Sequence, residues 1–219
     1  MPPSFGDLTY WNTRFSSEEN FDWLVADFTI LEPVLREIID GEKRFVTARV
    51  EKEDGGKDGK GKTPQILHIG CGNSSLSLKL RELVETATQI HNCDYSSVVI
   101  KRQRQREKEL LQKNDHAARS GGRELQTAAI YPPHILAIHL AYLARPGCRW
   151  VVLSYSSSRF SDWEGEEMPR GLPQPSQLWK LVKHEKIVQP PDPQDRVHRP
   201  PEMHHLYILE RTGVELKEV

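Results

Sequence analysis

Two glycines and one aspartate stand where a ligand of the nucleotide type could be held. Gly70 and Gly72 follow the apolar run 65–69, and Asp94 comes later at close to the roughly 20-residue spacing of a ribose-binding acid. Glycines permit a tight turn and let the backbone approach a ligand closely. The N–H groups at the start of the following helix then point toward that ligand. Because a carboxylate can accept hydrogen bonds from both ribose hydroxyls, the pattern predicts nucleoside binding.

Each of these residues also has a purely structural explanation. A Gly-x-Gly pair can be an ordinary strand-to-helix turn, and Ser75 replaces the third glycine of the dinucleotide-binding pattern. Asp94 alone can be the capping acid of a helix that begins near Ser96. The loop and the acid together favour nucleoside binding over both explanations. A nicotinamide-dependent oxidoreductase shares the two features, but the missing third glycine and the lack of a hydride-transfer constellation disfavour it.

The surrounding segments are typical of a strand, a glycine loop, a helix and a second strand. Residues 65–69 and 89–93 are short apolar-rich runs of the kind found in buried parallel strands. A helical stripe between them consists of Leu76, Leu80, Leu83 and Val84. This order makes a βαβ unit. Further helices are predicted over 28–39, 96–113 and 135–143, and further strands over 150–155, 181–188 and 206–209.

Several regions resemble, in the same order, the methyltransferase-like proteins that modify lysines of translation elongation factor 1-alpha. The resemblance to that family's cofactor-binding motifs rests on IGCGNS at 69–74 and CDYSSVV at 93–99. Four further segments are similar to other motifs of the family: YWNTRF at 10–15, FDW at 21–23, LARPGCRW at 143–150 and HLY at 205–207. The resemblance implies an α/β fold with the Rossmann-like sheet and flanking helices of a class I methyltransferase.

The resemblance also implies S-adenosylmethionine (SAM) as the cofactor. Gly70 and Gly72 would flank its methionine part, Asp94 would hold the ribose and Tyr95 would lie against the adenine. An aromatic lid over the cofactor would consist of Trp11, Phe15 and Trp23. Aromatic faces attract a sulfonium cation as they attract ammonium, although core packing is the structural alternative for these rings. Phe15 stands where the family has tyrosine, and no residue is implied as a catalytic base.

One part of the family's pattern has no counterpart here. Between Val98 and Leu143 the chain lacks the adenine-contacting acidic segment and the fourth strand with Asp-Lys-Gly-Thr, so a central strand is expected to be missing. The expected function is SAM-dependent methylation of a protein lysine, of the elongation factor 1-alpha type. We expect the shortened centre to impair it, because catalysis tolerates misplacement poorly. The alternative is a non-catalytic methyltransferase-like binding module. A shortened isoform, a faulty gene model and a pseudoenzyme are three open explanations of the shortening.

The 219 residues fit one domain, predicted to span 1–219. It is expected to comprise an aromatic lid and helix over 1–40, a flexible loop over 51–63 and a Rossmann-like core over 64–219. A net charge of −1 argues against a nucleic-acid or membrane binder as a whole. We interpret the basic stretch 101–123 as a solvated helix face rather than as a contact with RNA or an acidic protein.

The cysteines and histidines predict neither a disulfide framework nor a metal site. Cys71, Cys93 and Cys148 are odd in number and far apart, which favours a reducing, cytoplasmic location. No apolar run approaches the length that a membrane-spanning helix needs. Four histidines lack a metal-ligand spacing with acids or cysteines, so we interpret them as surface or strand residues: His184, His198, His204 and His205.

Overall fold

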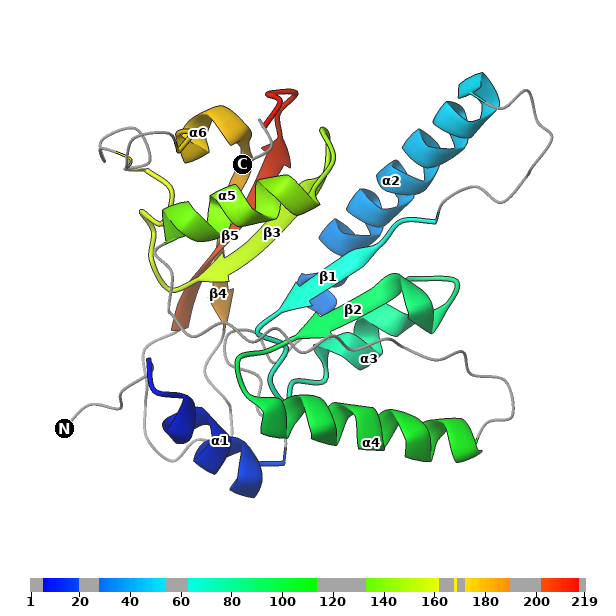
Figure 1. Cartoon of the computed structure of the whole chain (residues 1–219), viewed down its shortest axis with the longest axis vertical. Helices are drawn as coiled ribbons and strands as arrows, with labels where there is room; N and C mark the ends of the chain where they lie inside the picture. Colours follow the sequence, from blue (N-terminus) through cyan, green and yellow to red (C-terminus); the bar gives the residue numbers. More distant parts are fainter. Residues whose placement is uncertain are drawn as a thin grey trace. The chain divides into compact units, whose positions relative to one another are not determined.

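The computed structural model describes residues 6–19, 28–53, 63–113, 133–161, 168, 172–189 and 202–216. The backbone divides into two compact units, Met1–Ala128 and Ala129–Val219, hereafter the N-terminal and the C-terminal unit. Figure 1 labels their helices and strands along the chain. Each unit has its own sheet.

The N-terminal unit begins with helix α1 (Leu8–Ser17). The side chain of Asp7 caps its start by accepting the Thr9 N–H at 2.8 Å, which satisfies one of the free donors of the first turn. A short 3-10 turn (Phe28–Ile30) then leads into helix α2 (Glu32–Glu53). Pro33 sits in the first turn of α2, where its missing N–H costs no helical hydrogen bond. The first three residues of the predicted loop 51–63 are therefore helical, while 54–62 lie outside the described residues.

The predicted βαβ unit is confirmed. Strand β1 (Ile66–Ile69), helix α3 (Leu76–Arg81), a 3-10 turn (Ala87–Gln89), strand β2 (Ile90–Cys93) and helix α4 (Ser97–Lys113) follow in order. The two strands are parallel, with Ile66 opposite Ile90 and Ile69 opposite Cys93. Their carboxyl ends therefore meet at one edge of the sheet.

Helix α3 is shorter than its apolar stripe predicted. It ends at Arg81, so Leu83 and Val84 lie in the turns beyond it. Both side chains are nevertheless buried, in a cluster with Leu80, Ile90 and Ile39 of α2. The stripe thus indicated which side chains enter the core, although the backbone leaves the helix before the stripe ends.

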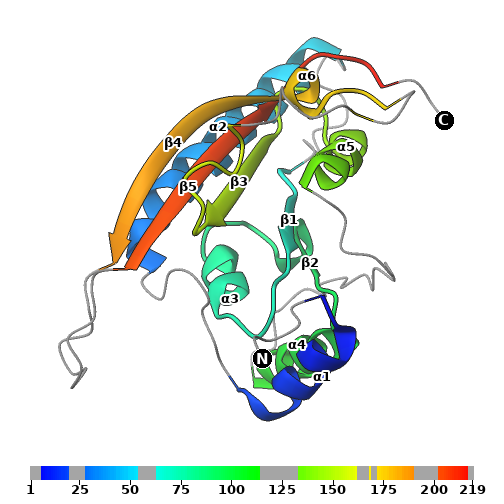
Figure 2. The ribbon, with the colours of Figure 1, turned by 90° about the vertical axis from the view of Figure 1, so that its left-hand side faces the viewer.

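The C-terminal unit holds the predicted helix and strands of the second half. They are helix α5 (Pro133–Leu143), strand β3 (Arg149–Ser154), a short helix α6 (Pro175–Leu178), strand β4 (Trp179–Gln189) and strand β5 (Glu202–Arg211). The strand order is β3-β5-β4, and β5 is antiparallel to both neighbours. The segment that resembles the family's last strand is therefore the centre of this sheet. Figure 2 shows β4 and β5 running side by side over their whole length.

Helix α5 packs on this sheet through its small and branched side chains. Ala137 and Ile138 are buried with Trp179 of β4 and with Tyr207 and Leu209 of β5. The indole N–H of Trp179 donates to the Ala137 carbonyl at 2.7 Å, so the large ring enters the core without an unsatisfied donor.

The mixed α/β class is confirmed, but a full Rossmann-like sheet is not shown. The described strands form a two-stranded parallel sheet and a three-stranded antiparallel sheet. Each strand pairs within its own unit, and residues 114–132, which link the units, lie outside the described residues. The single domain over 1–219 stays a prediction. Within the described ranges, no helix has both the length and the apolar character that crossing a bilayer requires.

Candidate functional site

The loop after β1 has the conformation that its glycines permit. Gly70 has φ 64° and Gly72 has φ 50°, both in the left-handed region that costs a non-glycine residue roughly 1–2 kcal/mol. Between them, the Cys71 N–H donates to the Cys93 carbonyl at 3.2 Å, so the loop continues the pairing of β1 with β2. The loop therefore lies at the carboxyl ends of the two parallel strands, as predicted from the spacing.

Asp94 is the residue that joins the loop to the next element. Its Oδ2 accepts the Gly72 N–H at 2.8 Å, and its Oδ1 accepts the Ser96 N–H at 2.8 Å, just before α4 begins. Burial raises the pKa of this carboxyl, while the N–H groups of Ser96, Gly72 and Tyr95 act in the opposite direction. A carboxylate has about four lone-pair positions, so Asp94 retains acceptor capacity beyond its bonds to Gly72 and Ser96.

Tyr95 follows the acid directly and stays open to solvent. It is 37% exposed, which leaves much of its ring available to stack on a ligand. Its predicted place against an adenine stays a prediction.

The N-terminal aromatics divide between the core and the undescribed part of the chain. Phe15 of α1 is 3% exposed and packs with Cys71, Val99 and Ile100. Its ring carbon Cζ would lie 3.6 Å from a Cβ at Gly72, so it supports the loop directly. Trp11 stacks on Phe15 with ring centroids 5.6 Å apart. Phe15 is therefore a core residue in this structure, as the structural alternative to a lid predicted. The predicted lid residue Trp23 lies outside the described residues.

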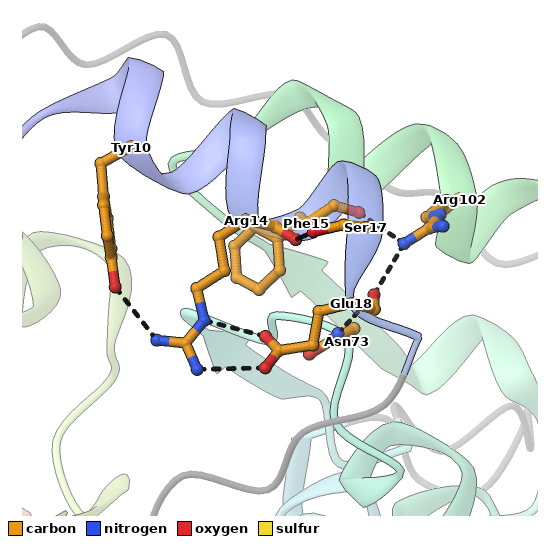
Figure 3. A network of polar contacts seen from close by, with 7 residues as sticks. All are labelled: Tyr10, Arg14, Phe15, Ser17, Glu18, Asn73 and Arg102. Atoms are coloured by element: carbon orange, nitrogen blue, oxygen red, sulfur yellow. Dashed lines mark hydrogen bonds and ion pairs between the residues drawn. The ribbon is translucent and has the colours of Figure 1, made fainter.

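A polar network fastens the end of α1 to the glycine loop and to α4 (Figure 3). The Glu18 carbonyl accepts from Asn73 Nδ2 at 2.9 Å and from Arg102 Nη1 at 2.8 Å. The side chain of Glu18 meanwhile accepts from Nε and Nη2 of the Arg14 guanidinium, at 2.8 and 3.1 Å. This pairing raises the pKa of Arg14. Tyr10 completes the network by accepting from Arg14 at 3.2 Å. The network holds α1 in place beside the loop.

Two arginines of the basic stretch are used inside this unit. Arg102 donates to the carbonyls of Phe15, Ser16 and Glu18, and Arg106 donates to the Glu19 carbonyl at 3.0 Å. These carbonyls at and just beyond the end of α1 have no partner within the helix, so the cations satisfy them. Neither explanation of the basic stretch, a solvated face or an RNA contact, anticipated this role. Its residues 114–123 lie outside the described part of the chain.

Part of the chain is similar to a known protein. No family model matches the chain. It is 30% identical to methyltransferase srdJ of Neurospora crassa over 102 residues, which are 47% of this chain and 35% of srdJ. The chain thus spans about a third of the length of that protein. Over this stretch the chain is similar to a methyltransferase.

A solved structure is also similar at low identity. It is described as "Conversion of a Disulfide Bond into a Thioacetal Group during Echinomycin Biosynthesis", and it is 14% identical with a TM-score of 0.41. The alignment covers 77% of this chain and 83% of that chain.

The structure brings together two residues that sequence spacing kept apart. His184 on β4 and His205 on β5 lie with Nε2 and Nδ1 3.0 Å apart. Sequence spacing does not indicate this histidine pair, because the register of β4 and β5 makes the two residues neighbours.

Proposed function

We propose that the N-terminal unit binds SAM and that the chain is a SAM-dependent methyltransferase. The observation that carries the proposal is the 2.8 Å bond between the Gly72 N–H and Asp94 Oδ2 at the carboxyl ends of β1 and β2. It places a positive-φ glycine loop and a partly buried acid side by side at the edge of a parallel sheet, where nucleotide-type ligands bind in α/β proteins. The partial similarity to srdJ supports the methyltransferase class.

The residues present fit a nucleoside with a cationic sulfonium group. Asp94 has acceptor capacity left for ribose hydroxyls, and its orientation is fixed by its bonds to the Gly72 and Ser96 N–H groups. Gly70 leaves the backbone open to close approach by the methionine part, because nothing lies within 4 Å of the position that a Cβ would take there. Tyr95 offers an exposed ring for the adenine. Bound SAM supplies an electrophilic methyl group, and these residues would orient it and exclude water.

The acceptor is a further step of the proposal. The resemblance to the elongation factor 1-alpha family supports a protein lysine, whose neutral amine attacks the methyl group in line with the departing sulfur. Such a displacement needs orientation more than a dedicated base. The family's Asp-Lys-Gly-Thr segment has no counterpart in this chain. We therefore expect the chain to bind SAM but to transfer its methyl group inefficiently.

Binding is tested by calorimetric titration with SAM, S-adenosylhomocysteine and NAD. We expect SAM and S-adenosylhomocysteine to bind, and NAD to bind more weakly or not at all. Asp94→Ala should weaken SAM binding by about ten- to a hundredfold, since a bond to a charged acceptor contributes roughly 1.5–3 kcal/mol. Asp40→Ala is the matched control, because Asp40 lies on α2 with a side chain 63% exposed.

Because Asp94 also holds the loop, Asp94→Asn provides a second variant. It keeps the shape and one carbonyl acceptor, so urea unfolding should show it closer to the parent in stability than Asp94→Ala. If both variants are folded and bind SAM as tightly as the parent, the nucleoside site is wrong.

A transfer assay separates the enzyme from the alternative, a non-catalytic binding module. Labelled SAM is incubated with the chain and purified elongation factor 1-alpha, and label in lysine is measured. Slow but Asp94-dependent transfer supports the enzyme, whereas SAM binding without transfer to any protein acceptor supports the binding module. Transfer at a rate typical of enzymes, on the order of 1 per second or faster, would contradict the expected impairment.

A further inference from the structure

A histidine pair on the C-terminal sheet has the geometry of a metal chelate. The Nε2 of His184 on β4 lies 3.0 Å from Nδ1 of His205 on β5, and the ring centroids are 5.1 Å apart. In the register His184 is opposite Tyr207 and His205 is opposite Lys186, so the two histidines are diagonal neighbours on one face. Long side chains at diagonal positions reach each other across antiparallel strands. One ring at present donates a proton to the other.

The His184 ring is held in place by its neighbour. It stacks on Tyr207 with centroids 4.2 Å apart and an interplanar angle of 10°. Tyr207 is itself only 2% exposed, and its hydroxyl donates to the Ser156 carbonyl at 2.7 Å. His184 is exposed and His205 half-buried, so the pair combines a fixed support with access from solvent. A ligand site with restrained side chains loses less entropy on binding.

The nitrogen separation indicates which coordination geometry fits. With metal–nitrogen bonds of about 2.0–2.1 Å, nitrogens 3.0 Å apart subtend about 91–97° at the metal. This is near the right angle between adjacent ligands of a square-planar or octahedral ion. A tetrahedral ion would need the nitrogens about 3.3–3.4 Å apart.

We propose that His184 and His205 form a two-imidazole site for a divalent transition metal, with Cu²⁺ or Ni²⁺ favoured over Zn²⁺. Binding requires the ring that now donates to carry its proton on its other ring nitrogen, so that the lone pairs of His184 Nε2 and His205 Nδ1 both converge on the metal. Imidazole suits all three ions, but tetragonal nitrogen and oxygen sites are typical of Cu²⁺ and Ni²⁺. Among the described residues no group of three or more histidine, cysteine or carboxylate ligands occurs.

The surroundings of His205 favour its neutral form. Desolvation lowers the pKa of His205, and the nearby His184, Lys186 and His204 lower it further. Metal binding requires the unprotonated ring, so a lowered pKa reduces competition from protons near neutral pH. His204 precedes His205 on β5 and is fully buried, and successive strand residues face opposite sides of a sheet. It is therefore not counted as a ligand.

The test is a titration of the tag-free protein with CuCl₂, NiCl₂ and ZnCl₂ at neutral pH, followed by calorimetry. His184→Gln and His205→Gln should each weaken Cu²⁺ binding by about a hundredfold or more, because a second linked ligand typically adds that factor. His139→Gln, which removes an exposed histidine of α5, should leave the affinity unchanged. Saturating Cu²⁺ should raise the melting temperature of the parent and not that of the double variant.

Electron paramagnetic resonance of the Cu²⁺ complex gives a readout that does not depend on any variant. We expect a tetragonal spectrum with coupling to two imidazole nitrogens in the parent and to one in each single variant. The proposal is overturned if the parent spectrum shows fewer than two imidazoles. It is also overturned if the double variant binds like the parent or if Zn²⁺ binds more tightly than both other ions.

Discussion

Replacing Arg102 with alanine should release the end of α1 from the glycine loop. The guanidinium donates to three carbonyls at and just beyond the end of α1, of which the Glu18 carbonyl is 2.8 Å and the Ser16 carbonyl 3.3 Å away. A hydrogen bond to a charged group contributes roughly 1.5–3 kcal/mol. Because Arg102 is only half-buried and its three bonds are not additive, we expect a total loss of about 2–3 kcal/mol.

This loss should open α1 locally before the unit unfolds. A difference of about 2–3 kcal/mol corresponds to roughly a 30- to 150-fold increase in the open population. Hydrogen exchange read by mass spectrometry should show the α1 amides losing protection by that factor. Amides of β1 and β2 should change far less. Lysine at position 102 keeps the charge near the helix end but not the planar fork, so Arg102→Lys should lose less protection than Arg102→Ala.

A neighbouring cation on the same helix is the control. Lys101 is exposed, and Lys101→Ala should alter stability by no more than about 0.5 kcal/mol. If Arg102→Ala leaves the exchange of α1 amides as slow as in the parent, α1 is held by Phe15 in the core and not by the arginine. If SAM binding is established, the same variant should also weaken it, since α1 supports the loop.

Three further predictions follow from the same unit. Gly70→Ala should cost about 1–2 kcal/mol because φ is 64°, while Gly41→Ala within α2 should stabilise by about 0.5–1 kcal/mol; equal shifts in urea unfolding would contradict this. Burial, Asp94 and Cys93 raise the pKa of Cys71 to about 12, so iodoacetamide at pH 8 should label it far more slowly than the half-buried Cys148, and equal rates would refute this. The raised folded pKa of Asp94 predicts that the stability of the parent relative to Asp94→Asn grows as pH falls through that pKa and is lost as pH rises through it. SAM binding should weaken as pH falls through the same window, above the ordinary aspartate pKa of about 3.9, because protonation removes the charged acceptor. A pH-independent stability difference would rule out this titration.

The elements around the candidate site were predictable because they follow from local patterns. The apolar runs gave β1 and β2 within a residue of each end, and α4 begins at Ser97, within a residue of the predicted start. The glycines marked a turn that only positive φ angles allow. Such signals depend on neighbours a few residues apart, which a sequence displays directly.

Contacts between distant segments were not predictable in the same way. The bonds from Arg102 to the end of α1 join residues more than 80 positions apart. The basic stretch showed its charge but not the carbonyls that the charge would meet. His184 and His205 became neighbours through the register of β4 and β5, which shifts between Leu181 and Lys183. A bulge of this kind changes which side chains face each other and leaves no clear mark in the sequence.

The two explanations of Asp94, a helix-capping acid and a ribose ligand, are compatible in this structure. The bond to the Ser96 N–H is the capping role, and the bond to the Gly72 N–H fixes the carboxylate against the loop. Together they restrain the side chain and aim its remaining lone pairs, which is the preorganisation that a binding residue needs. Burial opposes its charge in the free protein. Ribose hydroxyls and a sulfonium cation would both favour the charged form, so SAM binding should lower this pKa and release a proton at mildly acidic pH. Calorimetric heats of SAM binding should then depend on the ionisation enthalpy of the buffer, and this dependence should vanish in Asp94→Asn. Heats independent of the buffer in the parent would leave capping as the only role of Asp94.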